Sequence, residues 1–158
     1  MMFAAAVTAF TASAESVFDK DLNLWQKHRP KNIFVDTAVK VAGASSVRLE
    51  NEATLERYFD LKPDTTYELT FYIKGENVES GKNNGGRIML FDGKKKWGRI
   101  TSLPKNAIET GTFDWRQGKG TINSAQWGSK IRVSLALRGK GKLWFDEVEL
   151  KEVSSKTK

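Results

Sequence analysis

The sequence contains no cysteine and a single histidine, His28. Without cysteine there is no disulfide framework and no thiolate chemistry. One histidine excludes sites built from a histidine pair or a histidine cluster. The Gly-x-Ser-x-Gly elbow, the zinc motifs and the phosphate-binding loop are also missing. These absences favour a binding protein over an enzyme.

A sustained helical period is missing as well. Apolar and polar residues alternate instead, most clearly at 67–74 and 131–138, which is the pattern of a half-buried strand. Shorter strands are expected at 46–50, 55–61, 87–92, around 113–116, and at 142–150. Turn residues separate them at 62–64, at 83–86, at 92–93, at Gly118 and Gly120, and at 139–141. Many short strands separated by turns predict an all-β sandwich or barrel.

The two ends of the chain differ from the rest. Residues 1–14 carry no charge and end in Ala-Ser-Ala, the small-x-small pattern of a signal peptidase site. We interpret them as a signal peptide that lacks its basic n-region; the alternative is an apolar tail outside the fold. The interpretation predicts a secreted or periplasmic protein with one domain at 15–153 and a polar tail at 154–158.

Basic residues outnumber acidic ones by 26 to 19, giving a net charge of +7. Such a balance favours anionic partners: nucleic acid, anionic lipid or an acidic polysaccharide. The basic residues are scattered rather than gathered into a stripe, and the predicted export disfavours nucleic acid. The apolar stretch at 1–14 is too short to span a bilayer as a helix, so no membrane partner is expected.

Three segments match motifs of one protein group. Leu-Lys-Pro-Asp-Thr-Thr-Tyr-Glu-Leu-Thr-Phe-Tyr-Ile-Lys-Gly-Glu-Asn-Val at 61–78 resembles a strand–turn–strand signature, and Gly-Thr-Phe-Asp-Trp at 111–115 resembles a second one. Lys-Leu-Trp-Phe-Asp-Glu-Val-Glu-Leu at 142–150 resembles a closing strand. In this order they resemble jelly-roll carbohydrate-binding modules of families four, nine, sixteen and twenty-two, within the galactose-binding-like sandwiches. The similarity covers residues 16–153.

The resemblance implies an all-β, two-sheet antiparallel sandwich, a jelly roll, that binds a polysaccharide on its concave face or on its edge loops. Such modules often accompany a glycoside hydrolase or lyase. The alternatives for this chain are a fragment that belongs beside a catalytic domain, a free-standing binder, and a module that serves a partner enzyme. The fold is better specified than the ligand, because one fold hosts many functions.

Two tryptophans in polar, glycine-flanked segments are candidates for stacking on sugar rings. Trp97 follows a lysine triplet, with Arg99 two residues later as a hydrogen-bond donor, and Trp127 lies in Ala-Gln-Trp-Gly. The alternative is that either ring caps the core beneath a loop, since tryptophans are mostly well buried.

Outward-facing strand positions supply further candidates. Tyr72, Arg87 and Arg132 have the polar parity of their strands, as does Phe91. If these strands are neighbours, the four side chains form a binding cleft; the alternative is an ordinary solvated sheet face. The other tryptophans are assigned by pattern: Trp25 and Trp115 to the core, and Trp144 to the side opposite Leu143 and Phe145.

The resemblance also implies one structural calcium ion between the N-terminal segment and the last strand. Asp19 in Phe-Asp and Asp146 in the last strand occupy the matching places. Calcium takes six to eight oxygen ligands, so backbone carbonyls would have to complete the shell. The alternative is that both carboxylates are simple edge charges.

Two other classes of function stay open. The Glu-x-Asp-x-x-Glu strand of jelly-roll hydrolases is absent, because Asp146, Glu147 and Glu149 are spaced differently. Carboxylates that are distant in sequence could still converge in the fold to form the pair that catalysis needs. A structural or protein-binding adhesion sandwich without glycan affinity is the third interpretation. The sequence as a whole predicts a non-catalytic module that binds a polysaccharide, with acidic polymers favoured by the net charge.

Overall fold

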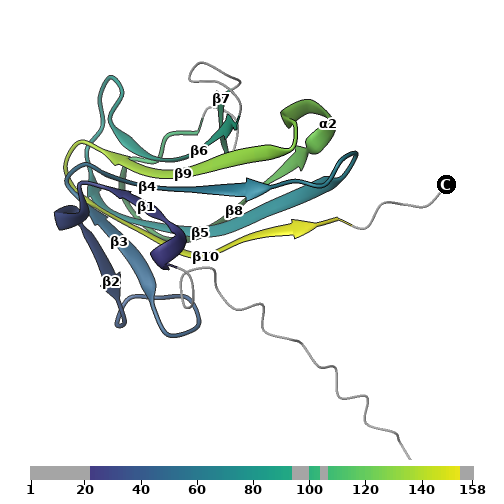
Figure 1. Cartoon of the computed structure of the whole chain (residues 1–158). Helices are drawn as coiled ribbons and strands as arrows, with labels where there is room; N and C mark the ends of the chain where they lie inside the picture. Colours follow the sequence, from purple (N-terminus) through teal and green to yellow (C-terminus); the bar gives the residue numbers. More distant parts are fainter. Residues whose placement is uncertain (1–21, 94–99, 104–106, 154–158) are drawn as a thin grey trace, which may run out of the picture.

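Two five-stranded antiparallel sheets lie face to face in the computed structural model, which describes residues 22–93, 100–103 and 107–153 (Figure 1). Sheet A contains, in spatial order, β1 (Gln26–His28), β4 (Ala53–Asp60), β9 (Lys130–Arg138), β6 (Gly85–Asp92) and β7 (Ile100–Leu103). Sheet B contains β2 (Ile33–Asp36), β3 (Ser46–Glu50), β10 (Lys142–Glu152), β5 (Thr66–Val78) and β8 (Gly111–Asn123). The predicted two-sheet β-sandwich is confirmed.

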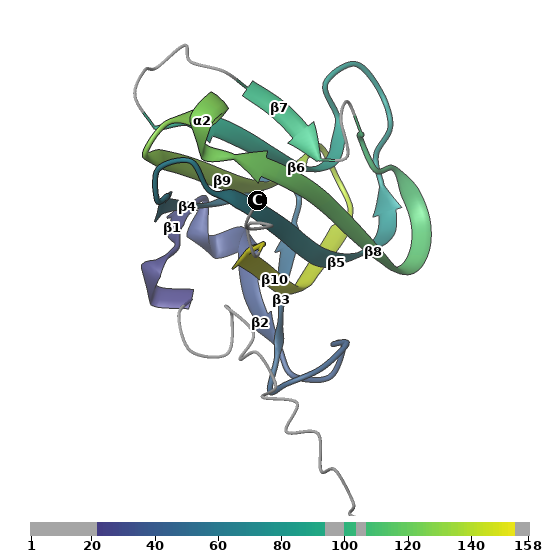
Figure 2. The same ribbon diagram turned by 90° about the vertical axis from the view of Figure 1, so that its right-hand side faces the viewer.

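Helical segments are short in the described part of the chain: η1 (Leu22–Leu24), η2 (Pro30–Asn32) and α2 (Ser124–Trp127). None of these segments is long and apolar enough to cross a membrane. Figure 1 shows α2 at one end of the sandwich, and Figure 2 views the molecule from that side.

The core lies between the sheets and is built by the alternation seen in the sequence. In β9, Ile131, Val133 and Leu135 are fully buried, and in β5 Leu69 and Phe71 face them from the other layer. Phe145 of β10 is the largest fully buried side chain. Burying a side chain of this kind contributes roughly 1.5–3 kcal/mol, so the inward parity of each strand is strongly specified.

One predicted turn is wrong. Gly118 and Gly120 do not end a strand, because β8 continues through both as the partner of β5. A Cβ at Gly118 would collide with the ring of Phe71 on the neighbouring strand. The glycine is therefore there to make room for a core aromatic ring rather than to turn the chain.

Three short strands, β1, β2 and β7, were not predicted. β1 reads Gln-Lys-His and all three residues are exposed, so it carries no apolar alternation. It is nonetheless placed by its pairing with β4, in which Gln26 lies opposite Glu56 and His28 opposite Thr54. Pairing with a neighbour, rather than local pattern, makes this segment a strand.

Trp25 is buried in the core, as predicted, with its ring edge-on to Phe59 at 6.3 Å between centroids. Trp115 was expected in the core but is only half-buried. The β5–β8 register shifts between Ile73 and Gly75, so Trp115 no longer shares the inward parity of Phe113. An irregular register is not visible in the sequence pattern.

Trp144 faces away from the core side of β10, as predicted, and is covered on the outer side of sheet B. Its indole Nε1 donates to Asp36 Oδ2 over 2.9 Å, and Arg48 Nη1 donates to the same oxygen over 2.7 Å. The backbone amides of residues 38 and 39 donate to Asp36 Oδ1. Although burial alone would raise the pKa of Asp36, the hydrogen bonds, with that of Trp144 the largest, lower it to about 2.

Candidate functional site

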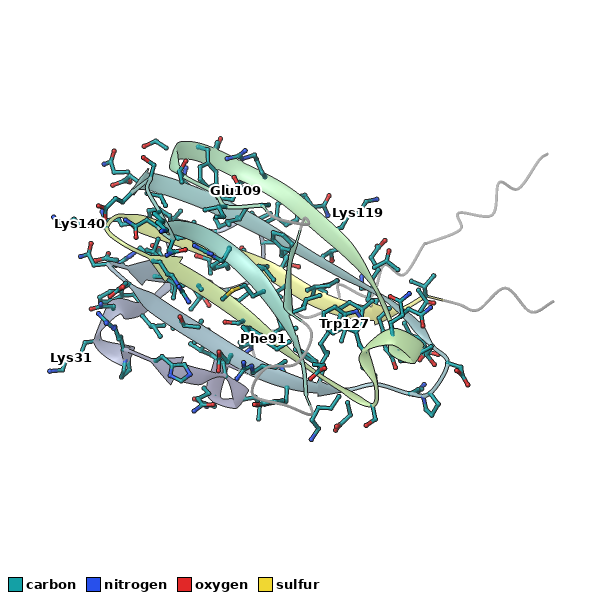
Figure 3. All side chains as sticks on the ribbon, turned by 90° about the horizontal axis from the view of Figure 1, so that it is seen from above. Lys31, Phe91, Glu109, Lys119, Trp127 and Lys140 are labelled. Atoms are coloured by element: carbon teal, nitrogen blue, oxygen red, sulfur yellow. The ribbon has the colours of Figure 1, made fainter. Side chains whose placement is uncertain are left out.

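The outer face of sheet A gathers aromatic, basic and polar side chains from four adjacent strands. Alternation points them away from the core, and the strand order brings them side by side. The set, called here the sheet A face, consists of His28, Glu56, Tyr58, Arg87, Met89, Phe91, Arg132 and Ser134. Figure 3 looks onto this sheet from above, with Phe91 labelled.

Two aromatic residues flank an arginine in one row across the sheet. Tyr58 of β4 and Phe91 of β6 both lie opposite Arg132 of β9. The Arg132 guanidinium carbon lies 4.1 Å from the centroid of the Phe91 ring, within the range of a cation–π contact. Tyr58 is 50% exposed. The row offers flat apolar rings beside a forked hydrogen-bond donor.

Glu56 joins two basic side chains next to this row. His28 Nε2 lies 3.2 Å from Glu56 Oε2, and Arg132 Nη1 lies 3.6 Å from the same oxygen. The carboxylate thereby holds the guanidinium in place beside Phe91. These contacts restrain the orientation of all three side chains on the face.

The sheet A face also contains buried polar atoms that make no hydrogen bond within the described residues. Arg87 Nε, Arg132 Nε and Ser134 Oγ are buried and lack a hydrogen-bond partner. Ser134 lies opposite Met89 on β6 and Glu56 on β4, in the middle of the face. Unsatisfied buried polar groups are uncommon in native proteins. Three of them on one face make this face a candidate functional site.

Of the predicted site residues, Arg87 and Arg132 do lie on one face, together with Phe91. Tyr72 does not join them, and the prediction of a shared cleft is wrong for this residue. It lies on β5 opposite Gln117 and Asp146, on the outer side of sheet B. The sequence pattern gave its outward parity correctly but contained no information about which sheet held the strand.

The interpretation of Trp127 as a residue that stacks on a sugar ring is not supported by its position. The residue ends α2, is 6% exposed and belongs to the core cluster. The alternative of a tryptophan capping the core is the one the structure shows. Trp97 and Arg99 lie outside the described residues.

The sequence pattern did not identify Tyr58, Glu56 and His28 as candidate site residues. The signal for the first two was present, because Ala53 and Leu55 are inward and Glu56 and Tyr58 alternate with them. What was missing was the adjacency of β4 and β9, which sets Tyr58 beside Arg132. His28 could not be placed without its pairing to β4.

The carboxylate of Asp146, which was predicted to bind calcium, accepts hydrogen bonds from backbone amides. Asp146 is fully buried, and its Oδ2 accepts from Val41 N at 2.6 Å and Ala42 N at 3.2 Å, while Oδ1 accepts from Glu147 N. Amide hydrogens at both oxygens stabilise the charged carboxylate. In the described residues no group of three or more potential metal-ligating side chains occurs, and Asp19 lies outside them. Calcium binding stays a prediction that the geometry of Asp146 does not favour.

A pocket of about 130 Å³ adjoins the sheet A face at the end of β1, β4 and β9. His28, Arg29, Glu52, Thr54 and Arg138 are among its lining residues. It extends the face towards the hairpin between β9 and β10, near Lys140 in Figure 3.

No protein-family model and no curated protein matches the sequence. Solved structures do match the fold. A family 16 carbohydrate-binding module superposes with a TM-score of 0.57 at 19% identity, covering 77% of this chain and 86% of that one. The chain has the fold of carbohydrate-binding modules.

Two further structures of this kind match along most of their length. The module TmCBM61, solved with β-1,4-galactotriose, has a TM-score of 0.54 at 20% identity over 82% of this chain and 88% of that one. The CBM22-2 xylan-binding domain of Xyn10C from Paenibacillus barcinonensis has a TM-score of 0.59 at 12% identity over 88% and 98%. The resemblance to jelly-roll carbohydrate-binding modules is thus confirmed at the level of the fold.

Proposed function

We propose that this carbohydrate-binding-module-like chain binds a polysaccharide along the sheet A face and has no catalytic activity of its own. The observation that carries the proposal is the row Tyr58–Arg132–Phe91, in which two aromatic rings flank a guanidinium held by Glu56. A sugar has an apolar face and a rim of hydroxyl groups. The row presents complementary groups to both, because aromatic rings stack on the apolar face and arginine donates to hydroxyl oxygens.

The same face argues against glycoside hydrolysis. Glycoside hydrolases use two carboxyl groups, one on each side of the scissile bond. Glu56 is held by His28 and Arg132, and Asp60, two positions further along the same side of β4, lies 3.5 Å from Lys130. A binding role accounts for the arrangement, with the chain supporting a hydrolase or lyase that acts on the same polymer. The net charge of +7 favours acidic polymers.

The proposal is tested by matched tyrosine substitutions on the two sheets. Tyr58→Ala and Phe91→Ala should each weaken binding to the recognised polymer about fivefold to tenfold, since one aromatic stacking contact is worth on the order of 1 kcal/mol. Tyr72→Ala removes the same side chain from the opposite sheet and should change affinity by less than about twofold. Affinity electrophoresis through gels that contain neutral and acidic polysaccharides measures all three variants against the wild type.

A greater loss with Tyr72→Ala than with Tyr58→Ala would move the site to sheet B and reject the sheet A face. If the wild-type protein is not retarded by any polymer, the alternative of a structural or protein-binding sandwich is supported instead.

A further inference from the structure

Arg87 has no described carboxylate partner, in contrast to four other arginines of the described residues. Arg29, Arg48, Arg116 and Arg132 each have a carboxylate oxygen within reach, at 2.6, 2.7, 3.0 and 3.6 Å. Arg87 makes its one described hydrogen bond to a backbone carbonyl, from Nη2 to Asn83 O over 2.7 Å. Its Nε is buried without a partner. The guanidinium charge is therefore held on the sheet A face without a neighbouring carboxylate among the described residues.

The electrostatic surroundings of Arg87 are unfavourable to its charge. Burial lowers the pKa of Arg87, and the positive charge of Arg138 lowers it further. A partly desolvated cation beside a second cation raises the free energy of the folded state. An anion placed between the two guanidinium groups would relieve both the desolvation and the repulsion.

Ala136, which lies opposite Arg87, is buried, and the side chain of Ile108 fills the space beside Gly85, which lies opposite Arg138. The open space next to the two arginines is therefore on the β4 side of Arg138. Thr54 flanks Ala136 on the other side, in the wall of the 130 Å³ pocket that Arg138 also lines. Arg138, on β9, thus lies between Arg87 on β6 and this pocket.

We infer that Arg87 and Arg138 form a subsite for the carboxylate of a hexuronate unit in an acidic polysaccharide. The inference rests on the proposed function, because the rest of the polymer would lie against Tyr58 and Phe91. These two regions are four residues apart along β6, which is about 13 Å in a strand, so one chain of several sugars can contact both. Guanidinium groups suit a carboxylate because their paired N–H donors match its two oxygens.

The test compares acidic polymers with the same polymers after their carboxylates have been reduced to hydroxymethyl groups. Affinity gels containing polygalacturonate or alginate are set beside gels containing the carboxyl-reduced forms of the same polymers and neutral xylan, all at 0.15 M salt, where the Debye length is about 8 Å. The wild-type protein should bind an acidic polymer at least about tenfold more tightly than its reduced form. Arg87→Gln and the exposed Arg138→Gln should each remove most of this preference.

A charge-matched control lies on the other sheet. Lys119→Gln removes one positive charge from β8, at the edge of sheet B (Figure 3), and should leave the preference intact. Thermal melting of each variant confirms that it is folded; because Arg138 is exposed, its variant keeps the test valid if Arg87→Gln is unstable.

The outcomes separate the subsite from the proposed function. Equal binding of acidic and reduced polymers overturns the subsite and leaves polysaccharide binding standing. An equal loss in Lys119→Gln also overturns it, because general charge attraction would then explain the preference. Failure to bind any of the polymers overturns the proposed function and the subsite together.

Discussion

Trp127→Ala is expected to destabilise the protein by about 3–5 kcal/mol, the usual cost of truncating a large buried aromatic residue. Trp127 is 6% exposed and belongs to the core cluster. The side chain also closes α2, whose first turn is capped by the Asn123 side chain accepting from Ala125 N. The loss should appear as a lower midpoint of denaturant unfolding, followed by far-ultraviolet circular dichroism.

Tyr58→Ala provides the control for this prediction, because its side chain is 50% exposed and should cost less than about 1 kcal/mol of stability. A conservative Trp127→Phe variant should recover a large part of the loss. Unchanged stability of Trp127→Ala, combined with lost polysaccharide binding, would contradict the buried position and return the residue to the binding surface.

The effect of Trp127 also reaches the turn that joins β4 to β5. Ser124 Oγ accepts from Thr65 N, and Ser124 N donates to Thr65 O. These bonds tie α2 to the 62–66 turn, so a cavity under Trp127 would loosen both segments. Such coupling between close neighbours makes substitution effects there non-additive.

The sequence predicted the fold well because its signal is local. In β9, four apolar residues alternate with Arg132, Ser134 and Arg138, and this alone fixes which side is inward. Two-sheet architecture then follows from many such strands separated by turns. β1 escaped prediction because it has no apolar side and exists only through pairing with β4.

The candidate site was predicted only in part because it depends on which strands are adjacent. Arg87, Phe91 and Arg132 were predicted together and do lie on one face. Tyr72 was grouped with them by parity, although β5 belongs to the other sheet. Tyr58 was left out for the complementary reason, since its place beside Arg132 arises from a pairing between strands more than seventy residues apart in sequence.

Pairing between distant strands also forms the hydrogen-bond network around Asp36, which no sequence motif predicted. Asp36 of β2, Arg48 of β3 and Trp144 of β10 come together because the three strands are consecutive in sheet B. Their side chains all point to the outer side of the sheet, where they cover one another. The network fastens the edge strand β2 to the centre of the sheet through side chains as well as through the backbone.

Asp36→Asn is expected to lower the free energy of unfolding at pH 7 by about 2 kcal/mol. The folded-state pKa of Asp36 is about 2, against an ordinary value of 3.8, and a difference of nearly two in pKa corresponds to about 2 kcal/mol. Because the pKa is lowered by folding, this contribution is fully present above about pH 4 and is lost as the pH falls through 2. The neutral amide also weakens the bonds donated by Arg48 and Trp144.

The measurement is denaturant unfolding of the wild type and the variant at several pH values between 7 and 2. The stability difference between them should be largest at neutral pH and should shrink below pH 4, because protonation of Asp36 then imitates the substitution. Asp60→Asn serves as the control, since that side chain is 88% exposed and its contact with Lys130 is 3.5 Å long; exposed pairs contribute at most about 1 kcal/mol. A stability difference for Asp36→Asn that stays constant from pH 7 to 2 would mean that the loss comes from altered packing around Trp144 and not from the charge.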